Sequence, residues 1–279
     1  MHGGWCKSAI GAVAAFILVV AATPAAVAQW PTYRAAGVPR TTDGRVDMTA
    51  PAPRTADGKP DLSGVWNYAG VLGFRGGPPP PPPGTPPEAT FWNIEAGIKE
   101  GLPFQPWAAE LRKQRMAGNS KDNPDASCLP LGYMQMHTHS QPRKIIQVKD
   151  LIVILYEANA GTRQIFLDGR PAPDNDPQPW WFGYSRGWWE GDTLVVESTH
   201  FRDDGWLDVN GAPLTSAGKL IERFRRPNFG RLEIDVTIDD PKAYTRPWTV
   251  RVNQRLLPDT ELIEFVCNEN QKFDPVRIK

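Results

Sequence analysis

The chain has 279 residues, and its 31 Lys and Arg residues balance its 31 Asp and Glu residues to a formal net charge of zero. This balance, without any basic stripe, excludes a protein that binds nucleic acid mainly through positive charge. The 11 Trp outnumber the 6 Tyr, and this surplus favours a ligand site lined by aromatic side chains.

The first 28 residues have the layout of a secretory signal peptide. Lys7 precedes an apolar run over residues 9–22, and the segment ends in the small residues Ala26-Val27-Ala28. The run is shorter than the roughly 20 apolar residues that span a bilayer. We therefore expect cleavage near Ala28 and a periplasmic or secreted protein without a membrane span.

Removal of this leader takes Cys6 away and leaves two cysteines in the mature chain, Cys128 and Cys267. An even pair of cysteines in an oxidising compartment predicts a disulfide bond. Two buried free thiols, which behave as small apolar side chains, are the alternative.

The mature chain begins with a segment of low apolar content. Residues 29–61 are rich in Pro, Thr, Arg and Asp, so we expect an extended, partly disordered linker. No internal repeat is expected in the chain. The ordered domain is predicted over residues 62–279. It contains a polyproline loop at 75–87, interpreted as an exposed spacer, and a short helix near 106–117 that begins with Pro and stops at Gly118.

From residue 143 onward, apolar and polar residues alternate in short runs that are separated by turns. The predicted strands are 64–66, 143–148, 151–157, 163–168, 181–189, 193–201, 219–225, 231–239, 248–257 and 262–268. Short connections between them indicate antiparallel hairpins. We therefore expect a mainly all-β fold, a single antiparallel up-and-down β-barrel of about ten strands, with an open sandwich as the alternative.

Several sequence blocks resemble an uncharacterised family of exported bacterial β-rich proteins. The blocks are DLSGVW at 61–66, CLP at 128–130, DGR at 168–170, WEGDTLVV at 189–196 and DPKAYTRPW at 240–248. Members of that family often carry His in the segment corresponding to 183–188, where this chain has none. The Gly-x-Trp of 64–66 is also similar to the first strand of calycin-type barrels, which include lipocalins. That similarity implies a ligand cavity in the mouth of the barrel.

His200 is the predicted catalytic residue, because it ends a strand and is followed closely by Asp203 and Asp204. A His beside carboxylates can have its pKa tuned towards neutral pH, which suits a general acid or base. A strand-end His next to a solvated acidic turn is the alternative interpretation.

His137 and His139 lie two residues apart, so on a strand both imidazoles would point to the same face and could contact one ligand. A fixed third ligand is missing from this pattern, and no metal site is predicted.

The remaining ligand-binding candidates are aromatic residues and charges that a barrel would have to pair. They are Tyr184, Trp188, Trp189, Trp206, Glu157, Arg163, Tyr244, Arg246 and Trp248. Glu222 and Arg223 are neighbours on one predicted strand, so at most one of them can line the interior. Inward charges in a barrel must be paired, because an unpaired buried charge costs several kcal/mol.

The pattern therefore predicts an exported protein that processes a partly hydrophobic or glycosidic small molecule in a Trp-lined barrel pocket. Lyase, isomerase or hydrolase chemistry would need only His200 and a nearby acid. The sequence has no phosphate-binding Gly-rich loop, Gly-x-Ser-x-Gly or His-Glu-x-x-His motif, so no cofactor is expected. The alternatives are a non-catalytic lipocalin-like carrier, a carbohydrate-binding module, or a cell-envelope interaction protein that uses the polyproline loop.

Overall fold

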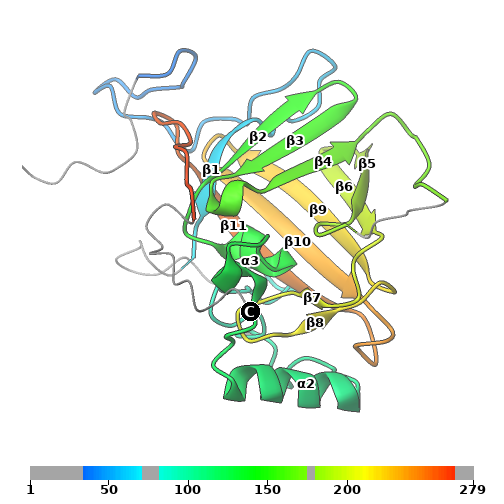
Figure 1. The fold of residues 1–279 in the computed structure, drawn as a ribbon. Helices are drawn as coiled ribbons and strands as arrows, with labels where there is room; N and C mark the ends of the chain where they lie inside the picture. Colours follow the sequence, from blue (N-terminus) through cyan, green and yellow to red (C-terminus); the bar gives the residue numbers. More distant parts are fainter. Residues whose placement is uncertain (1–33, 71–81, 175–179, 268–279) are drawn as a thin grey trace, which may run out of the picture. The chain divides into compact units, whose positions relative to one another are not determined.

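The computed structural model describes residues 34–70, 82–174 and 180–267, and its main feature is a closed β-barrel (Figure 1). Nine strands follow one another around the barrel in the order β1-β11-β10-β9-β6-β5-β4-β3-β2. Their bounds are β1 Gly64–Tyr68, β2 Arg143–Val148, β3 Leu151–Tyr156, β4 Thr162–Phe166, β5 Tyr184–Glu190, β6 Thr193–Thr199, β9 Lys219–Asn228, β10 Arg231–Asp239 and β11 Trp248–Leu256. The expected mainly-β barrel is confirmed, with nine barrel strands in the described residues where about ten were expected.

The barrel departs from a simple up-and-down series at one place. Every neighbouring pair of strands is antiparallel except β4 and β5, which are parallel and share only two residue pairs, Ile165–Ser185 and Phe166–Arg186. The long connection between these strands returns the chain to the end of the barrel at which β4 started, and a parallel pair requires such a return.

The segment 262–268 was also expected to be a strand, and this prediction is wrong for the described residues 262–267, which carry no strand. The reason is that β1 pairs with both β11 and β2. A closed barrel leaves no free edge for another strand. The segment instead follows the outside of the barrel, where the Ile263 N–H donates to Glu157 Oε2 at 3.3 Å.

Two helices and a small sheet belong to the same unit. α2 (Pro106–Ala117) occupies the range expected from the sequence and contacts β8. β7 (Gly205–Trp206) and β8 (Pro213–Leu214) form a separate two-stranded sheet. No helix in the described part of the chain is long and apolar enough to span a bilayer.

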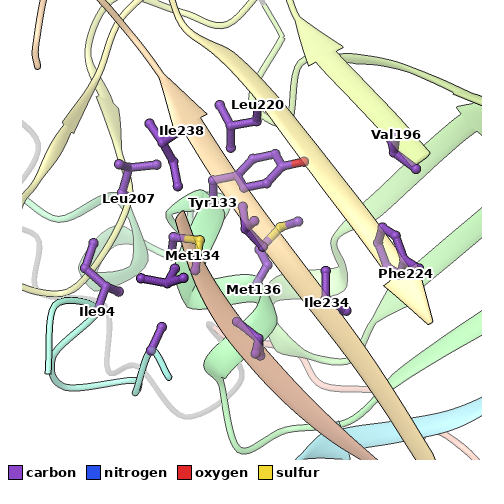
Figure 2. Packing of buried hydrophobic residues seen from close by; sticks show 14 of the residues in the cluster. Ile94, Tyr133, Met134, Met136, Val196, Leu207, Leu220, Phe224, Ile234 and Ile238 are labelled. Atoms are coloured by element: carbon purple, nitrogen blue, oxygen red, sulfur yellow. The ribbon is translucent and has the colours of Figure 1, made fainter. Parts of the chain in front are cut away.

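The short helix α3 (Tyr133–Thr138) fills the interior of the barrel, and all six of its residues are buried. Figure 2 shows its side chains among inward residues of β6, β9 and β10. The apolar residues that meet there are Tyr133, Met134, Met136, Val196, Leu220, Phe224, Ile234 and Ile238. The argument that His137 and His139 could share one face applied to a strand, whereas in the structure His137 lies on α3 and His139 follows its last residue. A helix is recognised in a sequence by apolar residues that repeat along one face, and a six-residue helix that is buried on all sides lacks this repeat.

The expected linker forms, in its described part, two copies of one turn. Residues 39–49 read PRTTDGRVDMT and residues 53–63 read PRTADGKPDLS, so the sequence contains an internal repeat that was not expected. In the first copy the Gly44 N–H donates to the Thr41 carbonyl, and in the second the Gly58 N–H donates to the Thr55 carbonyl, both at 2.9 Å. Both glycines have positive φ, 81° and 79°, which this turn requires.

The two copies attach to different parts of the barrel through the same arginine of the repeat. Arg40 binds the carboxylate of Asp259 at 2.8 and 2.9 Å, beyond the end of β11. Arg54 binds Asp192, in the turn between β5 and β6, at 2.9 and 2.7 Å. The repeat therefore provides two equivalent carboxylate contacts at separate sites.

The sulfur atoms of Cys128 and Cys267 lie at disulfide distance, 2.04 Å, with their Cα atoms 5.7 Å apart. Of the two alternatives drawn from the sequence, the structure contains the bridge. The predicted signal peptide and prolines 78–81 of the polyproline loop lie outside the described residues.

Candidate functional site

The parallel junction between β4 and β5 creates a recess in the barrel wall. The register leaves Thr162, Arg163 and Gln164 of β4 without partners on β5. A cavity of about 300 Å³ lies at this junction, and its lining includes Arg163, Ser185 and the run 180–184. We call it the seam recess.

Aromatic rings form much of the wall of the seam recess. The rings of Phe166 and Tyr184 stack with centroids 5.2 Å apart and an interplanar angle of 27°. Trp180 contacts Tyr184 edge-on at 6.1 Å, and the Arg202 guanidinium lies 4.0 Å from the ring centroid of Trp181. Flat apolar rings held in place in this way suit stacking against a ligand ring.

The backbone around the seam recess adopts unusual conformations. Asn159 and Ala160, which line it, have φ of 51° and 50°, and His200 beside it has φ of 63°. Gly183 also lies in the left-handed region, and a Cβ there would meet the Phe201 ring at 2.5 Å. Residues other than glycine rarely adopt this region, and such residues concentrate at functional sites.

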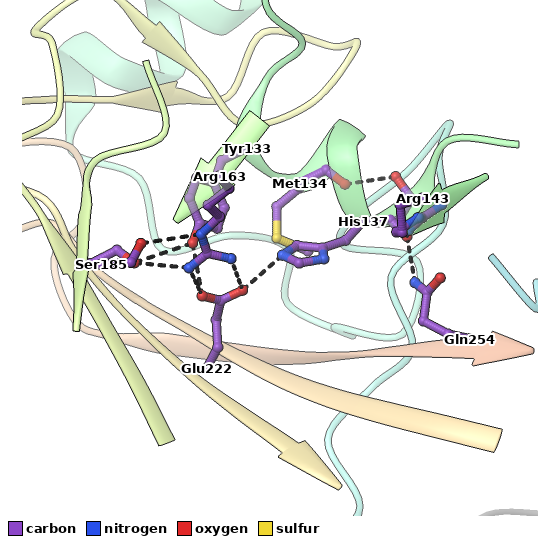
Figure 3. A network of polar contacts seen from close by, with 10 residues as sticks. Tyr133, Met134, His137, Arg143, Arg163, Ser185, Glu222 and Gln254 are labelled. Carbon is purple, nitrogen blue, oxygen red and sulfur yellow. Dashed lines mark hydrogen bonds and ion pairs between the residues drawn. The ribbon is translucent and has the colours of Figure 1, made fainter. Parts of the chain in front are cut away.

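A buried polar network lies inside the wall, behind the seam recess (Figure 3). At its centre the Glu222 carboxylate accepts hydrogen bonds from both terminal nitrogens of Arg163 and from the Tyr133 hydroxyl. The Arg163 Nε donates to Ser185 Oγ at 3.1 Å, and both of these residues also line the recess. The network therefore connects the recess to α3.

The electrostatics of this network keep Glu222 ionised. Burial alone would raise its pKa, but the charge of Arg163 and the hydrogen bond from His137 together lower the pKa to about 2. The pKa of Arg163 shifts upward. Burial of Arg163 would lower this pKa, but the charge of Glu222 outweighs the effect of burial. The expected pairing of an inward charge is thus realised by Glu222, while Arg223 faces outward.

His137 contacts the same carboxylate, with its Nε2 2.8 Å from Glu222 Oε1. Because an ionised carboxylate only accepts hydrogen bonds, Nε2 carries the proton and Nδ1 holds a lone pair. Burial lowers the pKa of His137. His139 is separate: its Nδ1 accepts from the Gln141 N–H at 3.1 Å. Within the described ranges no three metal-binding side chains lie close enough to hold a metal ion.

His200 lies next to the seam recess, with its ring 6.4 Å from that of Tyr184. Its Nδ1 is 2.8 Å from Thr199 Oγ1 and its Nε2 is 3.1 Å from the Pro173 carbonyl. A carbonyl only accepts, so Nε2 is the protonated nitrogen and Nδ1 accepts from Thr199. Both ring nitrogens are therefore engaged in the folded protein.

The two acids expected to act with His200 bind other groups. Asp204 pairs with Arg202 at 2.7 Å, and Asp203 accepts from the Ser216 hydroxyl at 2.7 Å. No contact in the described residues joins either acid to His200. His200 thus lies beside the recess without lining it, and Asp203 and Asp204 bind other groups.

Of the remaining sequence candidates, Tyr184 and Arg163 belong to the seam recess. Trp188 lies on the outer surface, where its indole donates to Glu190 at 3.2 Å. Trp189 packs against the core, and Trp206 is buried under Arg115.

The other candidates are dispersed. Tyr244 and Trp248 are buried in contact with each other, and the Tyr244 hydroxyl donates to the Pro213 carbonyl at 2.8 Å. Arg246 is exposed beside Glu100. Glu157 is buried and accepts from Ile263.

Sequence reasoning missed Trp180, Trp181 and Phe182 as site residues, although the aromatic run before Gly183 was visible. It also missed Tyr133, because nothing in the sequence showed that a helix enters the barrel. No protein-family model matches the chain, and no curated protein matches it either.

Proposed function

We propose that this protein is exported and binds a small, partly hydrophobic or glycosidic molecule in the seam recess. The observation that carries the proposal is the convergence of aromatic rings, a buried charged network and left-handed backbone at one break in the barrel wall. Pockets that combine aromatic side chains with a few fixed polar groups are typical of small-molecule sites.

The chemistry of the lining indicates the class of ligand. Tyr184 and Trp180 offer apolar faces, while the exposed side chains of Thr162 and Gln164 offer hydrogen bonds. A sugar ring or an aromatic glycoside combines an apolar face with hydroxyl groups at its edge, and both features can be satisfied here.

The closed barrel supports the calycin-like, lipocalin-like interpretation of the fold. The ligand position would nevertheless differ from a central cavity, because Tyr133, Met134 and Met136 of α3 occupy the interior. The bridge between Cys128 and Cys267 supports export to an oxidising compartment.

Acid–base catalysis by His200 is the second candidate function. It is supported by the strained φ of 63° at His200 and by its contact with Tyr184. Thr199 Oγ1 could pass a proton between a ligand and His200 Nδ1, because it already bonds that nitrogen. Such chemistry of lyase, isomerase or hydrolase type would need no cofactor. Binding is favoured because Asp203 and Asp204 pair elsewhere.

Incubation of the mature protein with a metabolite extract, followed by mass spectrometry, tests both candidates. We expect wild type to retain a compound that Trp181→Ala loses and that Trp188→Ala, on the outer face, still retains. A compound consumed by wild type but not by His200→Ala would establish the catalytic candidate. Equal retention by wild type and Trp181→Ala would contradict binding in the seam recess.

A further inference from the structure

The strand β3 is apolar on both of its faces. It reads LIVILY, and its inward side chains Ile152, Ile154 and Tyr156 are buried in the core of the barrel. Side chains alternate along a strand, so the other three point to the outside, where they are only half-buried: Leu151, Val153 and Leu155. A run that is apolar at every position is typical of a strand that is covered on both faces, whereas a strand that faces water alternates with polar residues.

The neighbouring strand β2 extends this apolar surface. Ile146 pairs with Val153 and Val148 pairs with Leu151, so both side chains of β2 point outward beside those of β3. Ile146 is 39% exposed and Val148 is 56% exposed. We call the five outward side chains of the two strands the outer apolar face: Ile146, Val148, Leu151, Val153 and Leu155.

The outer surface of the barrel is not apolar everywhere. On β10 the inward residues are apolar, but the outward ones include Arg231, Glu233 and Asp235. Glu233 pairs with Arg225 of β9, and Asp235 pairs with Arg251 of β11. The fold can therefore carry charged residues on its outer wall, and closure of the barrel does not explain the apolar residues on the outside of β2 and β3.

The charges around the outer apolar face balance one another in the described part of the chain. Three bases and three acids lie there as neighbours of opposite sign: Lys144 with Glu261, Lys149 with Asp150, and Arg170 with Asp168. A strongly charged partner or an anionic lipid surface would be attracted by an excess of one sign. A surface of the same composition fits better, because apolar groups then meet apolar groups and the mixed charges at the border can pair.

We propose that the outer apolar face binds the same face of a second copy of this chain and forms a symmetric dimer. A twofold axis brings one surface patch of each subunit together, so a patch that is apolar at its centre and balanced in charge at its border is self-complementary. Burial of the five side chains drives the association. The dimer does not depend on ligand binding in the seam recess.

Sedimentation velocity of the mature protein over a range of concentrations tests the proposal. Because the face covers only two short strands, we expect a monomer–dimer equilibrium with a dissociation constant of roughly 1–100 µM. Val148→Lys and Val153→Lys should each weaken dimerisation roughly a hundredfold or more, because the dimer would bury two unpaired ammonium groups. Met116→Lys is the control, since Met116 is 49% exposed but lies on α2, and this variant should dimerise as wild type does.

A mixture of charge variants separates loss of the interface from loss of the fold. Val153 lies at the centre of the face, between Ile146 and Gln164. At low ionic strength, Val153→Lys mixed with an equal amount of Val153→Asp should dimerise more tightly than either variant alone, because opposite charges then face each other.

A wild-type protein that stays monomeric up to about 500 µM would overturn the proposal. An equal loss of dimer in Met116→Lys, or no gain on mixing the two Val153 variants, would also overturn it. A monomer that floats with phosphatidylcholine vesicles would assign the face to lipid instead of a second copy.

Discussion

At the scale of single residues, the Glu222 carboxylate is surrounded by four donors: two nitrogens of Arg163, the Tyr133 hydroxyl and His137 Nε2. These donors come from a barrel strand and from α3, so the carboxylate fixes the helix inside the barrel. An intact buried ion pair such as Glu222–Arg163 adds little net stability. Removal of one partner is strongly destabilising, because the other charge stays buried without a counter-ion.

Glu222→Gln should therefore lower the free energy of unfolding by about 3–5 kcal/mol, because Arg163 stays buried without its counter-ion. Urea unfolding followed by Trp fluorescence measures this change. Glu190→Gln is the control, since Glu190 pairs with Arg223 on the exposed outer surface, where a pair is worth about 0–1 kcal/mol. Equal losses in the two variants would contradict the role given to Glu222.

The pH dependence of stability follows from the same carboxylate. The folded-state pKa of Glu222 is about 2, below its ordinary 4.5. The depressed value means that its stabilising contribution is complete above its ordinary pKa and is lost as the pH falls towards 2. We expect the urea midpoint of wild type to fall through this range and that of Glu222→Gln to fall less. Parallel curves would refute the assignment.

At the scale of elements, the junction of β4 and β5 is the weakest part of the barrel wall, because it has two residue pairs. β9 and β10, in contrast, pair along most of their length. Hydrogen exchange followed by mass spectrometry should show amides of 162–166 and 184–186 exchanging well before those of 231–239. Equal protection of both regions would argue against a seam that admits ligands.

The sequence predicted the elements whose pattern is local. β2 and β10 match their expected bounds, because one face of each is buried and the other is wet. Strand parity also anticipated that Glu222 and Arg223 face opposite sides. The helix α3 was not predictable from the sequence. All its residues are buried by contacts with the barrel, and the local sequence pattern does not show these contacts. The strand expected at 262–268 was not found because the barrel is closed by pairing between strands that are far apart in the sequence, and a local pattern does not show that pairing.

The candidate site was predictable only in part for a related reason. Tyr184 and Arg163, both named from the sequence, line the seam recess, and the His200 ring contacts that of Tyr184 from outside the lining. The sequence offered no reason to name Trp180 and Trp181, which line the recess, because the seam depends on a parallel register between β4 and β5. No local pattern reports such a register.

At the scale of the whole molecule, the bridge between Cys128 and Cys267 joins residues that are 139 positions apart. A cross-link over a loop this long is expected to stabilise the folded state by about 4–5 kcal/mol through the entropy of the unfolded chain. Iodoacetamide should alkylate neither cysteine of the mature protein before reduction and both after it. The reduced protein should unfold at lower urea. Alkylation without reduction would show that the bridge is absent.

The most direct test of the central claim is an NMR titration that follows the indole N–H signals of the mature protein while phenyl glycosides and plain sugars are added. Assignment by single Trp substitutions identifies each signal. Our account predicts saturable shifts of the Trp180 and Trp181 signals, with the Trp188 signal unchanged, because only the first two line the seam recess. Shifts confined to Trp188, or no saturable shift with any of these probes, would contradict it.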